Sequence, residues 1–386
     1  MAAPVSNNTL TNLIPDAYAA LDVVSRELIG FIPAVARDPR ADRVAVGQSL
    51  RSPVAPVNSA GGDIVPAMAV PSAANQTIGN KVFTLTKSRY FPFSWSGEDI
   101  YSVNQGPGFL TIQQDQIAQA FRAAINEMEA DIAVAAALGA SRAFGATAGT
   151  APLFTDWAQA KKILDDNGAP PSDRSSVVDT TAGVALRSTS NLYKVNEGGD
   201  ATLLRQGVLG NLFGLDIRES AQVQTTTAGT GASYTTTNAG YAVGTTTLHM
   251  ITGTGTILAG DIVTFAGDTN KYVVATGFAG DGTGDIVLAA PGLRKAMSAA
   301  TKAMTILGTS TRNCAFSRNA ILLGTRLPAM PPQGDMAIDR YTITDPRSSI
   351  AFELALYPGW HMNVYHVGAA WGVVVEKPEH LAIIVG

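Results

Sequence analysis

The side chains best suited to recognition lie between residues 37 and 91, and the first of them are four arginines, Arg37, Arg40, Arg43 and Arg51. A guanidinium pairs with carboxylates or phosphates, so these residues could belong to a solvated arm, contact nucleic acid, or meet acidic groups on a neighbouring subunit. Small and apolar residues and two aspartates interleave with them, unlike the dense basic tract of a nucleic-acid binder. The pattern favours contact with a neighbouring subunit.

Two lysines and an aromatic cluster follow the arginines. Lys81 and Lys87 flank a run of alternating apolar residues, and the cluster runs from Tyr90 and Phe91 to Trp95. Aromatic rings can stack on bases, but alternation with polar residues or proline is typical of one face of a β-sheet. Packing is therefore the favoured interpretation of the cluster. Lys81, Lys87, Tyr90 and Phe91 join the four arginines as candidate inter-subunit contact residues.

Signatures of catalysis and metal binding are scarce. The sequence contains no Walker phosphate loop, no GxSxG elbow, no HExxH and no CxxC pair. A His361/His366 metal site is one alternative, but the spacing is not that of metal ligands. A calcium site in segment 280–285 is another alternative, because Asp281 and Asp285 could bind the ion. Two carboxylates fall short of the roughly 6 to 8 ligands that calcium requires. A hairpin turn explains the glycines of this segment equally well. The sequence predicts no enzyme, metal or cofactor.

Composition limits the classes of protein that remain. Charged residues make up 15% of the 386 residues, below the ~25% of ordinary domains, so we expect partners to cover much of the surface. The net charge of −4 gives no sign of a nucleic-acid binder. The single cysteine, Cys314, excludes an internal disulfide and is expected to be an inert buried thiol. No secretory signal and no apolar run of about 20 residues is present, so neither export nor membrane insertion is expected.

Periodicity predicts the elements that must position these residues. An amphipathic helix is expected over residues 12–31, and a proline-rich extended arm over 33–71. Strands over 81–87 and 90–95 are expected to form a long two-stranded flap with that arm. A long helix over residues 111–138 carries one apolar stripe, and a second helix is expected over 155–166.

The second half of the chain reads as an α/β unit interrupted by a β-rich insertion. Residues 223–308 are rich in Thr, Gly and Ala, with short strands over 246–251, 261–265, 271–276 and 285–288, which predicts a small all-β barrel. Residues 315–323 fit a helix or a strand. Further strands are expected at the ranges 339–344, 350–357, 361–366, 369–376 and 382–385.

These parts, in this order, resemble the major capsid proteins of tailed phages with the Hong Kong 97 fold, and most closely the coat-protein family of short-tailed Salmonella phages. The motifs similar to that family are AGDIVTFAG at 259–267, FSRNAI at 316–321, LPAMP at 327–331, and WGV at 371–373 with PEHLAII at 378–384. The resemblance implies an α+β fold with an inserted small all-β barrel. Its expected parts are an N-terminal arm (1–35), an extended loop (36–96), a peripheral domain with a long spine helix (97–151), an axial domain in two parts (152–222 and 309–365), the inserted barrel (223–308) and C-terminal strands returning to the peripheral domain (366–386).

The same resemblance implies a major capsid protein that self-assembles into hexamers and pentamers of an icosahedral shell, in a virion assembled in the bacterial host cytoplasm. The implied partners are other copies of the chain, a scaffolding protein and a portal. The shell would enclose double-stranded DNA without sequence-specific binding, and no membrane is involved. The charged loop with which the family's best-known member ties capsomers together is replaced near residues 234–238 by a short uncharged segment. For Lys81 and Lys87, no carboxylate that could activate a cross-link can be named from the sequence.

Two alternatives of other kinds stay open at this stage. A nanocompartment shell protein of the same fold would enclose protein cargo instead of a portal and DNA. A β-rich surface adhesin or binding module would explain the Thr- and Gly-rich strands, but it would be expected to carry an export signal.

Overall fold

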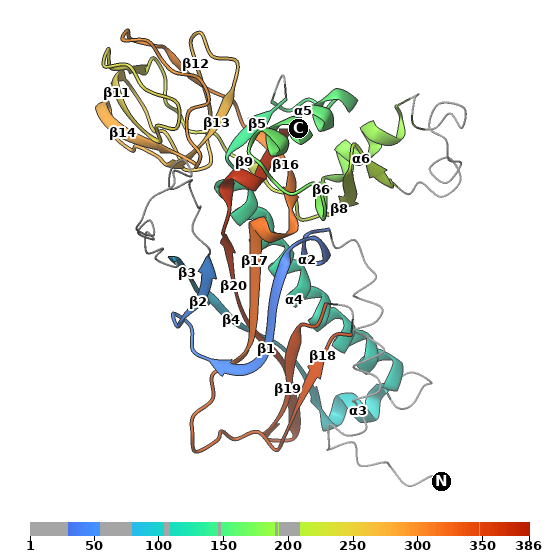
Figure 1. The fold of residues 1–386 in the computed structure, drawn as a ribbon. Coiled ribbons are helices and arrows are strands. Elements are labelled where there is room, and N and C mark those ends of the chain that lie inside the picture. The colour runs from blue at the N-terminus through green and yellow to red at the C-terminus, as the bar shows by residue number, and fades with distance from the viewer. Residues whose placement is uncertain are drawn as a thin grey trace, which may run out of the picture.

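The computed structural model describes residues 30–54, 79–103, 109–145, 148–189, 192, 209–346 and 348–386. The helix predicted over residues 12–31 lies outside them except for its last two residues, as does the second part of the predicted arm. The described strands form a six-stranded sheet, a larger mixed sheet and a two-stranded ribbon. In Figure 1 the six-stranded sheet occupies the lower half of an elongated molecule, and the mixed sheet lies above it.

The six-stranded sheet is built around one long strand. Its strands are β1 (Ala36–Val44), β4 (Lys87–Ser96), β17 (Ile321–Pro328), β18 (Asp339–Thr344), β19 (Ala351–Gly359) and β20 (Met362–Val375). β20 pairs with β4 on one side and with β19 and β17 on the other, while β1 lies parallel to β17. The two strands predicted over 361–366 and 369–376 are therefore one, because β4 pairs continuously across the residues between them.

One long helix covers one face of this sheet. α4 (Phe109–Gly139) begins two residues before the predicted start and would extend about 46 Å. The predicted apolar stripe is confirmed, since its side chains are buried against β19 and β20: Ile117, Phe121, Ala124, Ile125, Met128, Ile132 and Ala136. The core that contains the α4 stripe also includes residues of the mixed sheet, among them Val177, Phe316 and Ile383. The helix therefore lies against both sheets (Figure 1).

The predicted flap needs a correction. Only β2 (Ser49–Val54) and β3 (Gly79–Thr84) form a two-stranded ribbon, whereas β1 and β4 belong to the six-stranded sheet. The strand over 90–95 pairs with β20 because alternate aromatic residues, Phe91, Phe93 and Trp95, pack into the core beneath α4. Residues 36–44 are likewise a paired strand and not a free arm.

The mixed sheet combines α/β elements from both halves of the chain. Its first group of elements is β5 (Arg142–Phe144), α5 (Phe154–Asp166), β6 (Arg174–Val178), α6 (Thr180–Arg187), β7 (Asn211–Leu212), β8 (Leu215–Glu219), β9 (Thr225–Thr226), β16 (Ser310–Ser317) and β21 (Leu381–Val385). The order β5-β21-β16-β6-β8-β7 places the C-terminal strand between β5 and β16, which are more than 160 residues apart in sequence. Residues 315–323 are strands joined by a one-turn 3-10 helix, and the predicted helix over 155–166 is confirmed as α5.

The remaining strands form what we call the β10–β15 module. They are β10 (Thr235–Thr236), β11 (Thr247–Gly253), β12 (Ile262–Phe265), β13 (Lys271–Thr276), β14 (Gly282–Leu288) and β15 (Met304–Ile306). Each pairs antiparallel with the next in the order β10-β11-β14-β13-β12-β15. Bonds from Thr236 N to Lys302 O (2.9 Å) and from Met304 N to Tyr234 O (2.9 Å) then connect the last strand to the first. A separate apolar core fills the module.

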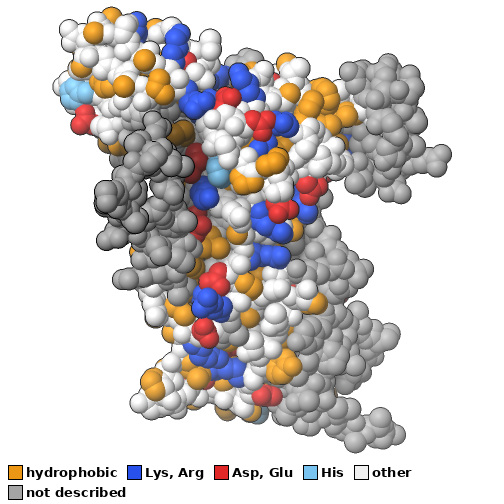
Figure 2. All heavy atoms as spheres, viewed as in Figure 1, with side chains coloured by type: hydrophobic (Ala, Val, Ile, Leu, Met, Phe, Trp, Pro, Cys, Tyr) orange, Lys and Arg blue, Asp and Glu red, His pale blue; other side chains and the backbone are white. Residues whose placement is uncertain are grey.

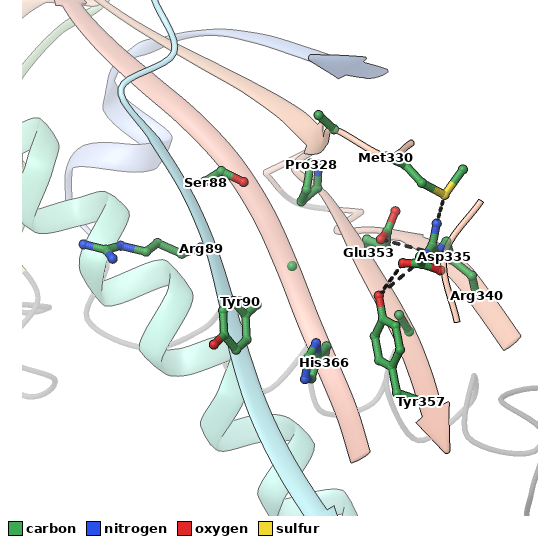
Figure 3. A pocket seen from close by; sticks show the side chains of 13 residues that line it. Ser88, Arg89, Tyr90, Pro328, Met330, Asp335, Arg340, Glu353, Tyr357 and His366 are labelled. Carbon is green, nitrogen blue, oxygen red and sulfur yellow. Dashed lines mark hydrogen bonds and ion pairs between the residues drawn. The ribbon is translucent and has the colours of Figure 1, made fainter. Parts of the chain in front are cut away.

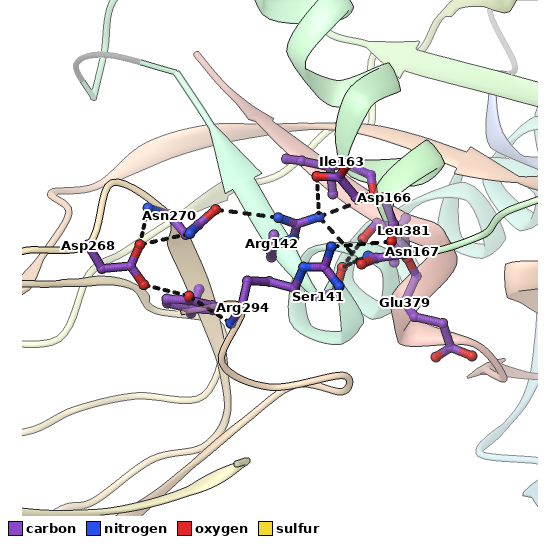
Figure 4. Close-up of polar contacts among 11 residues, drawn as sticks. Ser141, Arg142, Ile163, Asp166, Asn167, Asp268, Asn270, Arg294, Glu379 and Leu381 are labelled. Atoms are coloured by element: carbon purple, nitrogen blue, oxygen red, sulfur yellow. Dashed lines mark hydrogen bonds and ion pairs between the residues drawn. The ribbon is translucent and has the colours of Figure 1, made fainter. Parts of the chain in front are cut away.

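Arg142 links the module to the rest of the chain. β5 pairs with β13, so Arg142 lies opposite Tyr272 in the module. The buried guanidinium donates to Asn270 Oδ1 (3.4 Å) on the module side and to Ile163 O (3.3 Å) at the end of α5. Figure 4 shows it between Asn270 and Asp166, with Arg294 alongside. Because polar groups from three elements converge on one buried cation, the module is held in a fixed orientation.

Candidate assembly surface

The face of the six-stranded sheet opposite α4, which we call the open face, carries polar and aromatic residues. Strand alternation turns one set of side chains toward α4 and the next set away from it. The residues on the open face include Ser88, Tyr90, Arg340, Glu353, Tyr357 and His366. Figure 2 shows basic and acidic side chains side by side over this lower part of the molecule. The open face therefore combines charges of both signs with aromatic rings.

A small pocket, which we call the aromatic pocket, opens on this face between β4, β20, β19 and the loop after β17. Its volume is about 190 Å³. The ring of Tyr90 stacks on His366 with centroids 4.9 Å apart, and Tyr357 lies 4.8 Å from His366 on the other side. Figure 3 shows the three side chains in a row across adjacent strands. Burial lowers the pKa of His366, so its imidazole is neutral at pH 7 and presents a flat, uncharged ring.

An ion-pair network forms one wall of the aromatic pocket. Arg340 forms an ion pair with Asp335. Its Nε also lies 3.4 Å from Glu353 Oε1. Glu353 in turn pairs with Arg43. The hydroxyl of Tyr357 donates to Asp335 Oδ2 (2.7 Å). The hydrogen bond from Tyr357, with the charge of Arg340, lowers the pKa of Asp335 to about 2. Asp335 therefore stays ionised at any physiological pH.

The predicted contact arginines have partners within their own chain. Arg37 donates to Ser348 O (2.8 Å), Arg40 to Asp38 (3.2 Å), and Arg43 to Pro328 O (2.9 Å) besides Glu353. Their predicted role toward a neighbouring subunit stays a prediction. The backbones of Arg51 and Lys81 lie in the β2–β3 ribbon, and their side chains lie outside the described atoms.

Lys87 and Tyr90, three positions apart on β4, lie on opposite faces of the sheet. Lys87 points toward α4, where its Nζ lies 2.9 Å from Glu127 and 2.8 Å from Asp131, and Asp131 also accepts from the indole of Trp371 (2.7 Å). Burial opposes the charge of Lys87, but the two carboxylates outweigh it and raise its pKa. A protonated ammonium is not a nucleophile, so Lys87 is not prepared to form a covalent cross-link. The ion pairs instead hold β4 against α4. Phe91 also faces α4, within the core.

The buried carboxylate of Glu129 was missed in the sequence. It lies on α4 and accepts from the backbone N–H groups of Phe31 (3.0 Å) and Ile32 (3.1 Å), at the start of α2 (Phe31–Ala34). Burial raises its pKa to about 7 despite these hydrogen bonds and one with Ser220. A signal was present: Glu129 stands four residues after Ile125, inside the apolar stripe of the helix. Glu129 fastens the N-terminal segment to the long helix.

The other sequence candidates are taken up by ordinary structure. Asp281 accepts from Gly255 N–H (2.6 Å), and Asp285 is bonded to His249 across a strand pair. In the described part of the chain, no group of three His, Cys, Asp or Glu side chains could hold a metal ion. His361 lies in the β19–β20 turn, whereas His366 belongs to the aromatic pocket.

The expectation for the cysteine is confirmed. Cys314 is fully buried in β16, and burial raises the pKa of its thiol to about 12, so it stays protonated and unreactive. As for membranes, the described helices include none that is long and apolar enough to cross one.

Comparison with known proteins gives structural similarity only. No family model and no curated protein matches the sequence. The capsid of cyanophage P-SCSP1u is similar over 92% of this chain and 87% of its own, with 14% identity and a TM-score of 0.48. A Mycobacterium phage Che8 chain is similar over 89% of this chain and 88% of its own (15% identity, TM-score 0.47), and a Pyrococcus furiosus virus-like particle over 96% and 99% (8% identity, TM-score 0.44). Likeness at these identities and scores does not by itself assign a fold or a function to the chain.

Proposed function

We propose that this chain is the major capsid protein of a tailed phage, which self-assembles into hexamers and pentamers of an icosahedral shell around double-stranded DNA. The observation that carries the proposal is the order of paired elements: an N-terminal strand, a two-stranded ribbon, a long helix behind a sheet, and an α/β sheet interrupted by a β module. This is the order that the Hong Kong 97 resemblance implies. We assign α4 as the spine helix and the mixed sheet as the axial domain.

The ribbon supports a role in assembly. Within the described residues, β2 and β3 pair only with each other, and a two-stranded ribbon in water is marginally stable. Phe83 anchors one side of the ribbon on β17, while Val82 on the other side is 53% exposed. A neighbouring subunit covering the outer side would stabilise it, and weak contacts of this kind add up when many are made at once.

We further propose that the β10–β15 module is the inserted barrel of the short-tailed Salmonella-phage subgroup. The hydrogen bonds that join its last strand to its first support a closed arrangement, and its separate core supports a unit that folds around its own interior. Strand pairing between β9 and β16 brings Thr226 next to Ser310, so the chain leaves and rejoins the mixed sheet at one place. That arrangement fits an insertion.

The proposed partners follow from the same assignment. They are other copies of the chain, a scaffolding protein and a portal, with assembly in the host cytoplasm and the mature protein in the virion. We propose that neighbouring subunits are contacted by the arginines of β1 and of the β2–β3 ribbon, together with Lys81 and Tyr90.

Electron microscopy of the purified protein tests the proposal. The protein would be expressed alone and together with the product of the gene next to it, and each sample separated by size-exclusion chromatography. We expect closed icosahedral particles of uniform diameter. A monomer or dimer under every condition would overturn the proposal, and particles that enclose a host protein other than the co-expressed product would favour a nanocompartment.

A further inference from the structure

The turn between β19 and β20 displays a tryptophan in water. Trp360 is 89% exposed, the highest value for a large hydrophobic side chain in the described part of the chain. Only Trp360 and His361 form the turn, because Gly359 already pairs with Met362. Covering so exposed an indole with a partner would bury a large apolar surface, and tryptophan is enriched among the residues that dominate protein–protein affinity.

The tip of this hairpin is held in one geometry. His361 adopts φ +56°, and its carbonyl accepts from the N–H of Gly97 (3.0 Å), where β4 ends and α3 (Gly97–Val103) begins. The rings of Trp360 and His361 meet edge to face at 4.8 Å. Little conformational entropy is therefore lost when the indole docks, which favours binding.

The aromatic pocket has the size and chemistry to receive such a ring. Its 190 Å³ is smaller than the ~300 Å³ at which small-molecule sites begin, so it suits a single large side chain. Tyr90 and His366 present stacked rings, and Met330 at the rim adds a thioether, a group that packs well against aromatic rings. The charged wall is paired within itself and leaves the aromatic side open to an uncharged guest.

The tryptophan of the same chain cannot fill this pocket. Trp360 follows Tyr357 by three residues and lies in the turn just after β19, and cross-strand pairs continue through Pro358 and Gly359 up to that turn. The hairpin would have to unzip before its tip could fold back onto the open face. An indole that fills the aromatic pocket must therefore come from another molecule.

We propose that Trp360 of one copy of this chain inserts into the aromatic pocket of a second copy, against the side chains of Tyr90, His366 and Tyr357 that line it. The proposal rests on the self-assembly proposed above and names one of its contacts. Tip and pocket are different surfaces, so the contact is head-to-tail: each copy gives one tip and receives another. Repetition of such a contact generates a ring when the rotation closes.

Site-directed cross-linking tests this contact. Met362→Cys places a thiol beside the tip and Ser88→Cys places one at the pocket, while native Cys314 is fully buried and adds no background. The two variants are mixed under assembly conditions, treated with a short bismaleimide and run on a denaturing gel. We expect a cross-linked dimer at least ten-fold stronger than in a control mixture of Ser88→Cys with Val243→Cys, whose side chain is 59% exposed in the β10–β15 module.

A second substitution makes the result specific to the indole. Trp360→Ala in the Met362→Cys protein is expected to reduce the dimer to the control level, and Trp360→Phe to preserve most of it. A dimer no stronger than the control, or one indifferent to Trp360→Ala, overturns the contact.

Microscopy of the same samples separates this contact from the proposed function. Particles without an indole-dependent cross-link would remove the contact and leave the shell. An indole-dependent cross-link without closed particles would keep the contact and remove the shell.

Discussion

Glu129 is a carboxylate that folding removes from water, and its titration should be visible in the stability of the subunit. Because burial raises its pKa from 4.5 to about 7, the folded state binds the proton more tightly than the unfolded state. The stability that protonation contributes is complete below pH 4.5 and is lost as the pH rises through about 7. The loss is on the order of 3 kcal/mol.

Glu129→Gln, which imitates the protonated form, should therefore flatten the dependence of the urea midpoint on pH between about 5 and 8. Glu129→Leu serves as the control, since it cannot accept from Phe31 and Ile32 and should be destabilised at every pH by about 1–3 kcal/mol. If Glu129→Gln kept the wild-type slope, the assignment of this titration to Glu129 would be wrong.

Lys87 tests how much the cluster beneath β4 contributes. Lys87→Met removes a cation from two carboxylates, Glu127 and Asp131, all three groups being about one-quarter to one-third exposed. We expect a loss of about 1 kcal/mol in the free energy of unfolding, measured by urea denaturation. Lys161→Met is the matched control, because its pair with Asp165 is more exposed, and it should change stability by less than about 0.5 kcal/mol. Equal losses of stability in Lys87→Met and Lys161→Met would show that partial burial does not strengthen the Lys87 ion pairs.

One contact between the β2–β3 ribbon and the six-stranded sheet is an aromatic ring packed on a glycine. A Cβ at Gly324 of β17 would overlap the ring of Phe83, so Gly324→Ala must displace β3 from the sheet. We expect a loss of about 1–3 kcal/mol and faster hydrogen exchange in β3 than in β18. Gly97→Ala, which meets nothing within 4 Å, is the control and should leave exchange in β3 unchanged. Unchanged exchange in Gly324→Ala would mean that Phe83 does not hold the ribbon.

The junction between the β10–β15 module and the mixed sheet depends on Arg142. Arg142→Ala leaves the acceptors Asn270 and Ile163 O without their donor, and we expect a loss of about 2–4 kcal/mol. Amide hydrogen exchange should become faster in β13 and β5. The amides of β11 and β14 should stay protected, because the core of the module holds these strands. Arg294→Ala, at an exposed residue of the same network, should cost less than about 1 kcal/mol. Equal destabilisation by the two variants would contradict a special role for Arg142.

Local patterns in the sequence predicted elements better than their partners. The alternation of Phe91, Phe93 and Trp95 is enough to predict a strand, but its pairing with β20 joins residues about 270 positions apart, which no local period encodes. The cluster of Lys87 with Glu127 and Asp131 was out of reach for the same reason. The apolar stripe of α4 was predicted because it repeats within one helix. Half of the aromatic pocket can be predicted from the sequence, which singles out Tyr90 as a contact residue but suggests for His366 only a structural role or, less favoured, a metal site.

Across the whole molecule, the two sheets share α4 and exchange strands from both halves of the chain. β1 and β4 from the first hundred residues lie in one sheet with β17–β20, and the C-terminal β21 lies between β5 and β16. A subunit interlaced in this way cannot lose either terminal half without losing a core. We therefore expect the protein outside the β10–β15 module to unfold in one transition in calorimetry, and Glu129→Leu to shift that transition as a whole. Separate transitions for the two sheets would contradict this.

The pairing of Thr226 with Ser310 holds the two ends of the β10–β15 module side by side. About eighty residues leave the mixed sheet and return to it at adjacent backbone positions, and apart from β5 no strand outside the module depends on them for pairing. Evolution or an engineer could exchange that segment for an unrelated folded domain whose own termini lie close together. In the proposed shell, the module would then differ from one such variant to another while the two sheets that carry the proposed contacts kept their shape.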